Sequence, residues 1–275
     1  MSRMAGGASE LWICQAASMT TFVLVHGAWG GAHTWKSIRP LLAPHPVFTP
    51  ALTGIGERVH LASPQVDLSL HAQDVINLVE YEDLHDIVLV GFSYGGMVVT
   101  ATLDRIGDRV RELVYLDAFV PNDGQSLGDL TSSPNPPGAL GDEWLIAPRP
   151  RVIDDPDEAA WNEVRRTAQP YRTFTENARL SKPVEAFAFG LTYVKALDDP
   201  IVSDRRNPFW DAAARAKANT RWRYAEIDTN HMIPQNRPHE LATLLLSLVR
   251  RRTDDRGPGS SGTAGEAGDE LKDGC

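Results

Sequence analysis

Between Thr20 and Arg251, the chain alternates short apolar runs with stretches in which apolar residues recur at helical spacing. The short runs predict buried β-strands at Phe22–His26, Pro46–Thr49, Ile87–Val90, Leu113–Asp117, Thr192–Leu197 and Trp222–Ile227. Apolar positions three and four residues apart predict helices at Leu70–Glu80, Gly95–Arg105, Asn207–Ala218 and Arg237–Arg251. Strands that are apolar throughout and alternate with helices are typical of a mainly parallel sheet covered on both faces. The predicted fold class is therefore α/β.

Residues 121–190 depart from this rhythm and contain no strand signal of comparable length. The segment begins with turn-forming residues, PNDGQSLGDLTSSPNPPGALGDEW, and shows only a weak helical pattern at Asp157–Arg166. An insertion of this size in a parallel sheet usually lies over the carboxyl ends of the strands, where open α/β folds bind ligands. We expect residues 121–190 to form a cap over such a site.

Composition mainly excludes classes of function. The 275 residues are 42% hydrophobic and 23% charged, which fits one soluble globular domain, placed here at residues 20–252. The formal net charge of −9 argues against nucleic acid as a partner. No apolar stretch approaches the roughly 20 residues that span a bilayer, so no membrane partner is expected. We expect a cytoplasmic protein with a small-molecule partner, and the sequence leaves a homodimer open.

The two ends of the chain differ from the domain between them. Residues 1–19 lack the apolar core of a secretory signal, which indicates a disordered leader or sequence upstream of a start at Met19. Residues 253–275 are rich in Gly, Ser and charge, and disorder is predicted there too. The only two cysteines are Cys14 and Cys275, so no disulfide framework is expected.

A sharp turn is predicted at Ser93, because only GFSYGG separates the run Ile87–Val90 from the helix after it. Gly91, Gly95 and Gly96 are small enough for that helix to pack back on the strand. The Ser93 backbone is then expected to be strained, with its hydroxyl lifted clear of the sheet beside a helix N-terminus. Amide N–H groups and the helix dipole favour negative charge there. The pattern predicts an acyl-transfer nucleophile; the alternative is a purely structural glycine-rich turn.

A serine hydroxyl is a weak nucleophile and needs a general base. Of the eight histidines, His231 lies in EIDTNHMIPQNRP, between the last strand-like run and the final helix, and therefore at the same sheet edge as Ser93. The alternative for His231 is a loop side chain that faces solvent. His26 ends the first strand and is expected to shape the turn after it. Surface or capping roles are expected for the rest: His33, His45, His60, His71, His85 and His239.

The base in turn needs a carboxylate that fixes its tautomer and stabilises the imidazolium. The stretch KALDDPIV places Asp198 and Asp199 directly after a strand-like run, and the order Ser, Asp, His is the one expected on this kind of sheet. Asp199 is favoured over Asp198. Asp117, at the end of ELVYLD, is a third candidate, although the more favoured role for it is to accept hydrogen bonds from loop amides.

An oxyanion hole needs two N–H donors aimed at the developing charge. Tyr94, the residue after the nucleophile, is expected to supply one. The loop in VLVHGAWGG is expected to supply the other from Ala28, because Gly27, Gly30 and Gly31 let the backbone bend close to the substrate. This loop matches neither a P-loop nor G-x-G-x-x-G, which argues against nucleotide binding. No spacing typical of metal ligands is present, so no metal is expected.

The motifs TFVLVHGAWGGAHTW, LTGIGERVHL, VLVGFSYGG, LVYLDAFVP and NHMIPQNRPHELA resemble the landmarks of the α/β-hydrolase superfamily in their usual order. The resemblance covers about Thr20–Arg251 and is strongest to the branch of plant methylesterases, hydroxynitrile lyases and small bacterial esterases. It implies a cap after the sixth strand and no cofactor. By the same resemblance, the site residues are Ser93, Asp199 and His231 as the triad and Ala28 and Tyr94 as oxyanion donors.

Two positions help to choose an activity within this branch. Its lyases carry a threonine after the first-strand histidine and a lysine after the catalytic histidine, where this chain has Gly27 and Met232. An ammonium group could stabilise departing cyanide and Met232 cannot, while Gly27 leaves room for a carbonyl oxygen. The resemblance therefore implies hydrolysis of a carboxylic ester through an acyl-enzyme, and cyanohydrin cleavage is disfavoured.

The substrate is less well defined by the sequence. Four aromatic residues are expected to line a mainly apolar pocket for a small or medium ester: Trp29, Phe92, Phe119 and Trp144. For each of them, ordinary core packing is an equally good interpretation. The same triad could also perform C–C or amide hydrolysis or cofactor-free perhydrolysis, and the fold can serve as a small-molecule receptor with little turnover.

Overall fold

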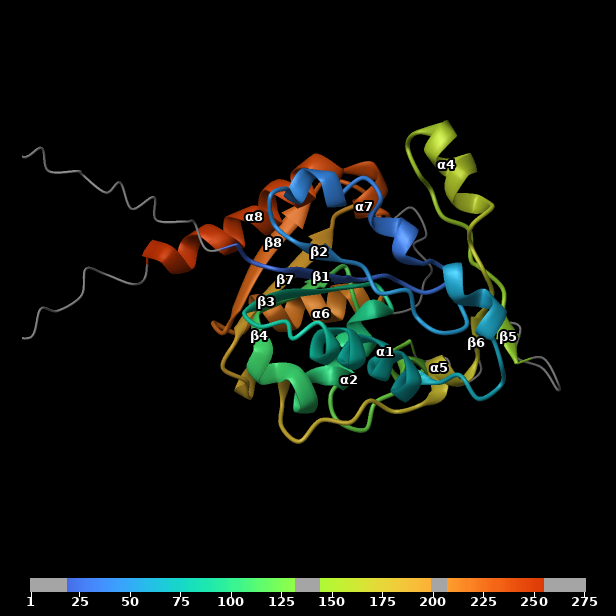
Figure 1. Cartoon of the computed structure of the whole chain (residues 1–275), viewed down its shortest axis with the longest axis horizontal. Helices are drawn as coiled ribbons and strands as arrows, with labels where there is room; N and C mark the ends of the chain where they lie inside the picture. Colours follow the sequence, from blue (N-terminus) through green and yellow to red (C-terminus); the bar gives the residue numbers. More distant parts are fainter. Residues whose placement is uncertain (1–18, 132–143, 199–206, 255–275) are drawn as a thin grey trace, which may run out of the picture.

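A six-stranded parallel sheet forms the centre of the chain in the computed structural model, which describes residues 19–131, 144–198 and 207–254 (Figure 1). From one edge to the other, the strands are β2 (Val47–Phe48), β1 (Phe22–Val25), β3 (Ile87–Phe92), β4 (Val110–Leu116), β7 (Gly190–Ala196) and β8 (Trp222–Ile227). Every neighbouring pair is parallel. Strands β3 and β4 are buried at every position, because helices cover both faces of the sheet.

The helices divide between the two faces. On one face lie α1 (Leu68–Tyr81), α2 (Gly95–Ile106) and α6 (Pro208–Lys217); on the other lie α8 (Pro238–Asp254) and the 3-10 helices η1 (Ala32–Trp35) and η2 (Arg39–Leu42). Val75 and Val98 pack against the first face, and Trp35 and Leu245 against the second. Shorter elements complete the connections: η3 (Gly56–Leu61), η4 (Gly107–Arg109) and α7 (Ile233–Asn236).

The predicted cap is present as an insertion of short elements between β4 and β7. Its described parts are α3 (Leu127–Leu130), β5 (Leu145–Ile146), α4 (Pro156–Glu163), β6 (Gln169–Pro170), α5 (Arg172–Thr175) and η5 (Val184–Ala186). Strands β5 and β6 pair antiparallel, and α4 stands out at the upper right of the molecule in Figure 1. The resemblance implies a cap after the sixth strand, but here the cap follows β4, the fourth strand of the sheet. The difference arises because the described part of the chain has no strand of this sheet before β1.

The order of the strands places a crevice at the carboxyl ends of β1 and β3. The chain passes from β1 to β2 on one side and then crosses to β3 on the other. Connections that diverge in this way leave an opening at the edge of the sheet, which is where open α/β folds bind ligands. The loops after β4, β7 and β8 reach the same edge, because all six strands are parallel.

The six predicted strands and the four predicted helices of the main domain are all present, with ends shifted by a few residues. The clearest shift is in β4, which begins at Val110 instead of at the predicted Leu113. The charged residues Arg111 and Glu112 precede the apolar run and are also buried within the strand. Arg111 donates to Thr20 Oγ1 at 3.0 Å, and Glu112 pairs with Arg223. Helix α8 runs to Asp254, three residues past the predicted end of this helix at Arg251. Residues 1–18 and 255–275 lie outside the described residues, so disorder of the ends stays a prediction.

Two histidines are fully buried beside the core and hold loops through both ring nitrogens. His26 Nδ1 donates to the carbonyl of Gly27 at 2.9 Å, and its Nε2 accepts from Leu52 N–H at 3.2 Å. His71 Nε2 donates to Thr53 O at 2.8 Å, so its Nδ1 accepts from the hydroxyl of Tyr94 at 3.0 Å. Both rings are therefore neutral. Burial lowers the pKa of each to about 4, from 6.5. His26 thus shapes the turn after β1, as the sequence predicts. The surface or capping role expected for His71 is wrong, because its ring is fully buried.

We expect the free energy of unfolding to fall as the pH drops from 6.5 to 4. In that window the unfolded chain protonates both histidines while the folded chain does not, so acid favours unfolding. Below pH 4 the loss approaches roughly 3 kcal/mol for each ring. Urea denaturation at a series of pH values would measure this loss. The free energy of unfolding of His71→Gln should depend less steeply on pH than that of the wild type. His60→Gln changes an exposed position, so its pH dependence should equal that of the wild type. Equal slopes in all three proteins would contradict this account.

Candidate active site

Ser93 forms the apex of a strained turn between β3 and α2. Its φ of 56° lies in the left-handed region, which non-glycine residues rarely adopt. Three backbone hydrogen bonds hold this conformation: Ser93 N–H donates to Leu116 O at 3.2 Å, and Ser93 O accepts from Gly96 N–H at 3.1 Å and from Phe119 N–H at 3.2 Å. The strain expected from the sequence is therefore present, and its effect is to direct the hydroxyl away from the sheet.

The start of α2 packs so closely on the sheet that only glycine fits. A Cβ atom on Gly95 would lie 2.7 Å from the carbonyl oxygen of Val25, at the end of β1. A Cβ atom on Gly91 would lie 2.7 Å from the carbonyl oxygen of Gly95. Both oxygens belong to the backbone and cannot move aside cheaply. These glycines allow the helix N-terminus to lie directly beside the Ser93 hydroxyl.

His231 lies on the loop between β8 and α7, and its imidazole reaches the nucleophile. The ring nitrogen Nε2 is 2.9 Å from Ser93 Oγ, a hydrogen-bonding distance. The ring is also stacked between two aromatic side chains. Phe92 lies 5.0 Å from it between ring centroids at 29°, and Phe209, from α6, lies 4.8 Å away at 16°. This stacking restricts rotation of the imidazole, so Nε2 stays directed at Ser93.

The carboxylate that meets His231 is that of Asp117, at the end of β4. Its Oδ2 is 2.6 Å from His231 Nδ1, and the side chain is completely buried. From the sequence, Asp117 is only the third candidate and a structural role is favoured for it; its contact with His231 does not support that order. Asp198 is exposed. Asp199, the favoured candidate, lies outside the described residues, so its role stays a prediction.

A buried lysine supports the same carboxylate from the other side. Lys195, on β7, donates from Nζ to Asp117 Oδ1 at 2.7 Å and has no exposed surface. The backbone N–H of Ala196 donates to Oδ1 at 3.3 Å. Burial alone would raise the pKa of Asp117, but hydrogen bonding and charge from His231 and Lys195 outweigh it and hold that pKa below its usual value. Asp117 is therefore ionised and oriented toward the imidazole.

The backbone N–H groups of Ala28, which lines the pocket with Ser93, and of Tyr94, which follows Ser93, have no acceptor among the described residues. Trp29, which follows Ala28, has a φ of 61° and donates its own N–H to Gln169 Oε1 of the cap at 3.1 Å. The Trp29 indole Nε1 donates to Ile146 O at 3.0 Å, also in the cap. The cap thus fixes the loop on which the predicted oxyanion donor Ala28 lies.

A narrow pocket of about 30 Å³ opens on the nucleophile and the imidazole. Its lining comes from the loop after β1, the nucleophile turn, the cap and the His231 loop: Gly27, Ala28, Gly30, Thr34, Phe92, Ser93, Arg151, Asn162, Arg166, His231 and Met232. The lining is mixed rather than mainly apolar, which corrects the expectation from the sequence. Three of its six polar members come from the cap: Arg151, Asn162 and Arg166.

Of the four aromatic residues expected to contact substrate, only Phe92 is among those that line this pocket. Trp29 is buried and packs edge-on against Phe174 at 5.8 Å between ring centroids. Phe119 packs against Phe209 at 4.8 Å, behind the imidazole. Trp144 accepts a backbone hydrogen bond from Tyr171. For Trp29, Phe119 and Trp144, contact with a substrate remains a prediction.

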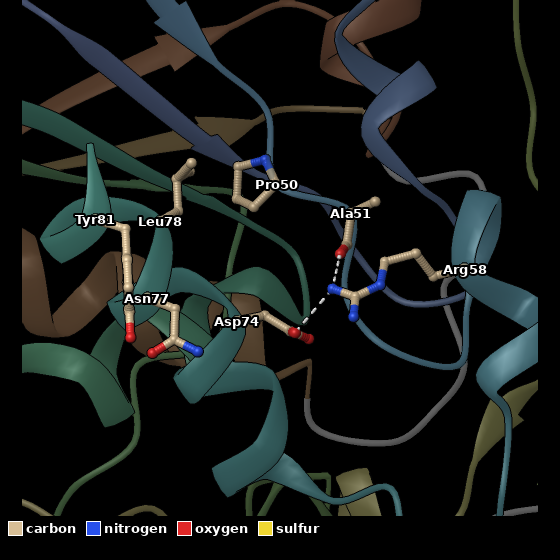
Figure 2. A pocket seen from close by; sticks show the side chains of 7 residues that line it. All are labelled: Pro50, Ala51, Arg58, Asp74, Asn77, Leu78 and Tyr81. Atoms are coloured by element: carbon tan, nitrogen blue, oxygen red, sulfur yellow. Dashed lines mark hydrogen bonds and ion pairs between the residues drawn. The ribbon is translucent and has the colours of Figure 1, made fainter.

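A wider surface hollow of about 510 Å³ shares no residue with the pocket at Ser93. It is lined by Pro50, Ala51, Arg58, Asp74, Asn77, Leu78 and Tyr81 (Figure 2). The guanidinium of Arg58 bonds to the Ala51 carbonyl at 3.2 Å and the Asp74 carboxylate at 2.9 Å. Asp74 also accepts from the backbone N–H and the hydroxyl of Thr53. The charged groups of this hollow therefore pair with each other and with the protein, and no nucleophile lines it.

Several site residues were not found from the sequence. Lys195 had a usable signal, because it is a charged residue inside the otherwise apolar run TYVKAL of a buried strand. Phe209 and Gln169 had none, since their roles depend on how α6 and the cap fold against the loops. Within the described ranges, no cluster of three or more His, Cys, Asp or Glu side chains could hold a metal ion. The described helices include none that is both long and apolar enough to cross a membrane.

Comparison with known proteins identifies one family. The sequence profile described as "Alpha/beta hydrolase family" matches residues 22–244, which is most of the chain. A "Carbendazim hydrolyzing esterase" from Nocardioides sp. (strain SG-4G) is 50% identical over 121 residues, 43% of this chain and 50% of that protein. An "Alpha-hydroxynitrile lyase" from Arabidopsis thaliana is 35% identical over 134 residues, 44% of this chain and 48% of that protein. Methylesterases of Arabidopsis thaliana also match.

The chain spans about half the length of the curated relatives it matches. A solved structure covers more of it. The extracellular alpha/beta-hydrolase from a Paenibacillus species superposes with a TM-score of 0.70 at 24% identity, over 84% of this chain and 99% of that one. This likeness shows the α/β-hydrolase fold. The matched relatives also bear out the branch suggested by the sequence motifs.

Proposed function

The chain belongs to the alpha/beta hydrolase family, and we propose on that premise that it hydrolyses carboxylic esters through a covalent acyl-enzyme. The observation that carries the proposal is the hydrogen-bonded series from Ser93 Oγ to His231 Nε2 and from His231 Nδ1 to Asp117 Oδ2. A nucleophile, a base and a carboxylate in contact in that order are the arrangement that acyl transfer requires. The esterases among the relatives support the same reaction class.

The first half of the reaction forms the acyl-enzyme. His231 Nε2 accepts the proton of the Ser93 hydroxyl as Oγ attacks the ester carbonyl carbon. The imidazolium is stabilised by Asp117, to which Nδ1–H donates at 2.6 Å. His231 then gives the proton to the departing alcohol oxygen, and the carbon–oxygen bond of the ester breaks. The acyl group is left on Ser93.

The second half repeats this chemistry with water. His231 removes a proton from a water molecule, whose oxygen attacks the acyl carbon, and the proton then passes to Ser93 Oγ as the acid departs. Both tetrahedral intermediates carry negative charge on the former carbonyl oxygen. The unpaired N–H groups of Ala28 and Tyr94 are suited to stabilise that charge, and loss of one such donor typically costs about 10²–10³ in rate.

Cyanohydrin cleavage is the second candidate, because one relative is an alpha-hydroxynitrile lyase. Two features argue against it. Met232 lines the pocket beside His231 and offers a thioether where a cation could stabilise cyanide. A Cβ atom on Gly27 would lie 3.0 Å from Ser93 Cβ, so glycine keeps space open beside the nucleophile. Cyanohydrin cleavage also needs no acyl-enzyme, so detection of an acyl-enzyme would distinguish ester hydrolysis from it.

The test is turnover of simple esters. Purified protein should release both alcohol and acid from methyl and 4-nitrophenyl esters of short acids, with a burst of 4-nitrophenol equal to the enzyme concentration if deacylation is slower. Cyanide release from mandelonitrile should be at background. Binding of esters without release of alcohol would instead indicate a receptor, and rapid cyanide release without ester turnover would indicate a lyase.

A further inference from the structure

The side-chain amide of Asn162 opens on the pocket at Ser93 and makes no hydrogen bond within the described part of the chain. Asn162 lies near the end of α4, is 5% exposed, and lines the pocket that contains Ser93 and His231. Its backbone carbonyl accepts from Arg165 N–H, but its side chain makes no bond to a described residue. The amide is therefore available to hydrogen-bond a molecule bound in the pocket.

Two guanidinium groups line the same pocket from the cap: those of Arg151 and Arg166. The Arg166 side chain is 7% exposed; it pairs with Glu163 at 3.1 Å and donates to the carbonyl of Arg149. A guanidinium has five N–H donors in a planar fork, so these two bonds leave donors for a ligand. Arg151 lies against the ring of Trp29, 5.6 Å from its centroid. None of the residues that line the pocket is acidic.

The helix that carries Asn162 is anchored to the body of the protein. Lys36, just after η1, lies 4.0 Å from the centroid of the Trp161 ring and 3.3 Å from Glu158 Oε2, both on α4. His33 packs edge-on against Trp161 at 5.9 Å between ring centroids. These contacts hold Asn162, the next residue, at a fixed position over the pocket. A pocket of about 30 Å³ also means that a substrate must contact the cap residues that line it.

We propose that Asn162 and Arg166, assisted by Arg151, form a subsite for a carboxylate, so that the preferred substrate is an ester that also carries an acidic group. Arginine binds carboxylates through two parallel hydrogen bonds, and the amide of Asn162 supplies a further donor. The cap then selects the substrate while Ser93, His231 and Asp117 react with the ester. This proposal rests on the proposed ester hydrolysis and identifies its substrate class.

Two pairs of esters matched in shape test the subsite, because the acidic group can lie on either side of the reacting bond. On the acid side, monomethyl succinate is compared with methyl 4-methylpentanoate; on the alcohol side, 3-acetoxypropanoate is compared with 3-methylbutyl acetate. In at least one pair, kcat/KM for the anionic ester should exceed that for the neutral ester by about tenfold or more. Assays at low and high salt should show the preference weakening as salt rises.

Substitutions then identify the residues that cause the preference for anionic esters. Arg166→Met and Asn162→Leu should each reduce the ratio of anionic to neutral kcat/KM by about tenfold, chiefly through KM for the anionic ester. Arg165→Met is the matched control, since Arg165 is exposed, neighbours Arg166 and does not line the pocket; its ratio should equal that of the wild type. A wild-type enzyme that hydrolyses neutral esters as well as anionic ones in both pairs would overturn the subsite and leave ester hydrolysis standing. Failure to hydrolyse any of the four esters would overturn both.

Discussion

Replacing Ser93 with alanine is expected to lower kcat for ester hydrolysis by about 10⁶-fold, the loss typical of removing a triad nucleophile. The methyl group of alanine cannot attack the carbonyl, and Ser93 Oγ is the hydroxyl that lies 2.9 Å from His231 Nε2. Initial rates with a 4-nitrophenyl ester would measure the loss. Residual rate should come only from binding and the oxyanion donors, which act on water in place of Oγ.

The matched variants make this result specific. His231→Ala should lose a similar factor, and the double variant should lose little more, because the two groups act in the same step. Ser63→Ala, at a loop position that does not line the pocket, should keep the wild-type rate. Circular dichroism should show the same fold for all of these variants. If Ser93→Ala retained more than a few per cent of the wild-type kcat, the acyl-enzyme mechanism would be untenable.

Replacing Asp117 with asparagine is expected to lower kcat by about 10⁴-fold. The amide no longer stabilises the imidazolium, and it can favour the wrong tautomer of His231, whose Nδ1 now lies 2.6 Å from Asp117 Oδ2. Asp199→Asn and Asp198→Asn should change kcat by less than tenfold. Since the pKa of Asp117 is held below its usual value, the carboxylate should not limit the rate until well into the acid range.

The prediction for Asp117→Asn needs a control because Lys195 forms an ion pair with Asp117. Asp117→Asn leaves the Lys195 ammonium buried without its counter-charge, which can destabilise the fold and imitate a catalytic loss. Thermal unfolding should therefore accompany the kinetics, and the double variant Asp117→Asn, Lys195→Met removes the unpaired charge. A 10⁴-fold loss in the folded double variant would support the assignment. A large loss with Asp199→Asn and a small one with Asp117→Asn would instead establish the carboxylate that the sequence favours.

Much of the fold follows from local patterns in the sequence. Parallel strands such as Ile87–Phe92 are covered on both faces, so they appear as unbroken apolar runs, and the longer helices have one apolar face each. The cap was less predictable. Its elements, for example Leu145–Ile146 and Leu127–Leu130, are two to four residues long and produce no periodicity. They are held by tertiary bonds such as that from Trp29 Nε1 to Ile146 O.

In the active site too, some residues could be predicted from the sequence and others could not. The Ser93 turn was predictable because its glycines and strain are encoded within a few residues, and His231 because it follows the last strand. The carboxylate partner of His231 was not predictable from the sequence. Strands β4 and β7 both end at the same edge of the sheet, and an aspartate follows each of them in the sequence. Chain order does not distinguish Asp117 from Asp199, because both lie between Ser93 and His231. Only the distances from His231 Nδ1 to the carboxylates can make the choice, and the sequence does not contain them.

Covalent labelling by a serine-directed fluorophosphonate examines the reactivity of the proposed nucleophile most directly. Intact-mass spectrometry should find one phosphonyl group per chain, peptide mapping should place it on Ser93, and hydrolysis should stop in proportion to labelling. His231→Ala and Asp117→Asn should slow the labelling, while Asp199→Asn should not. Labelling at a different residue, or full ester turnover by a quantitatively labelled protein, would contradict the role of Ser93 as the nucleophile.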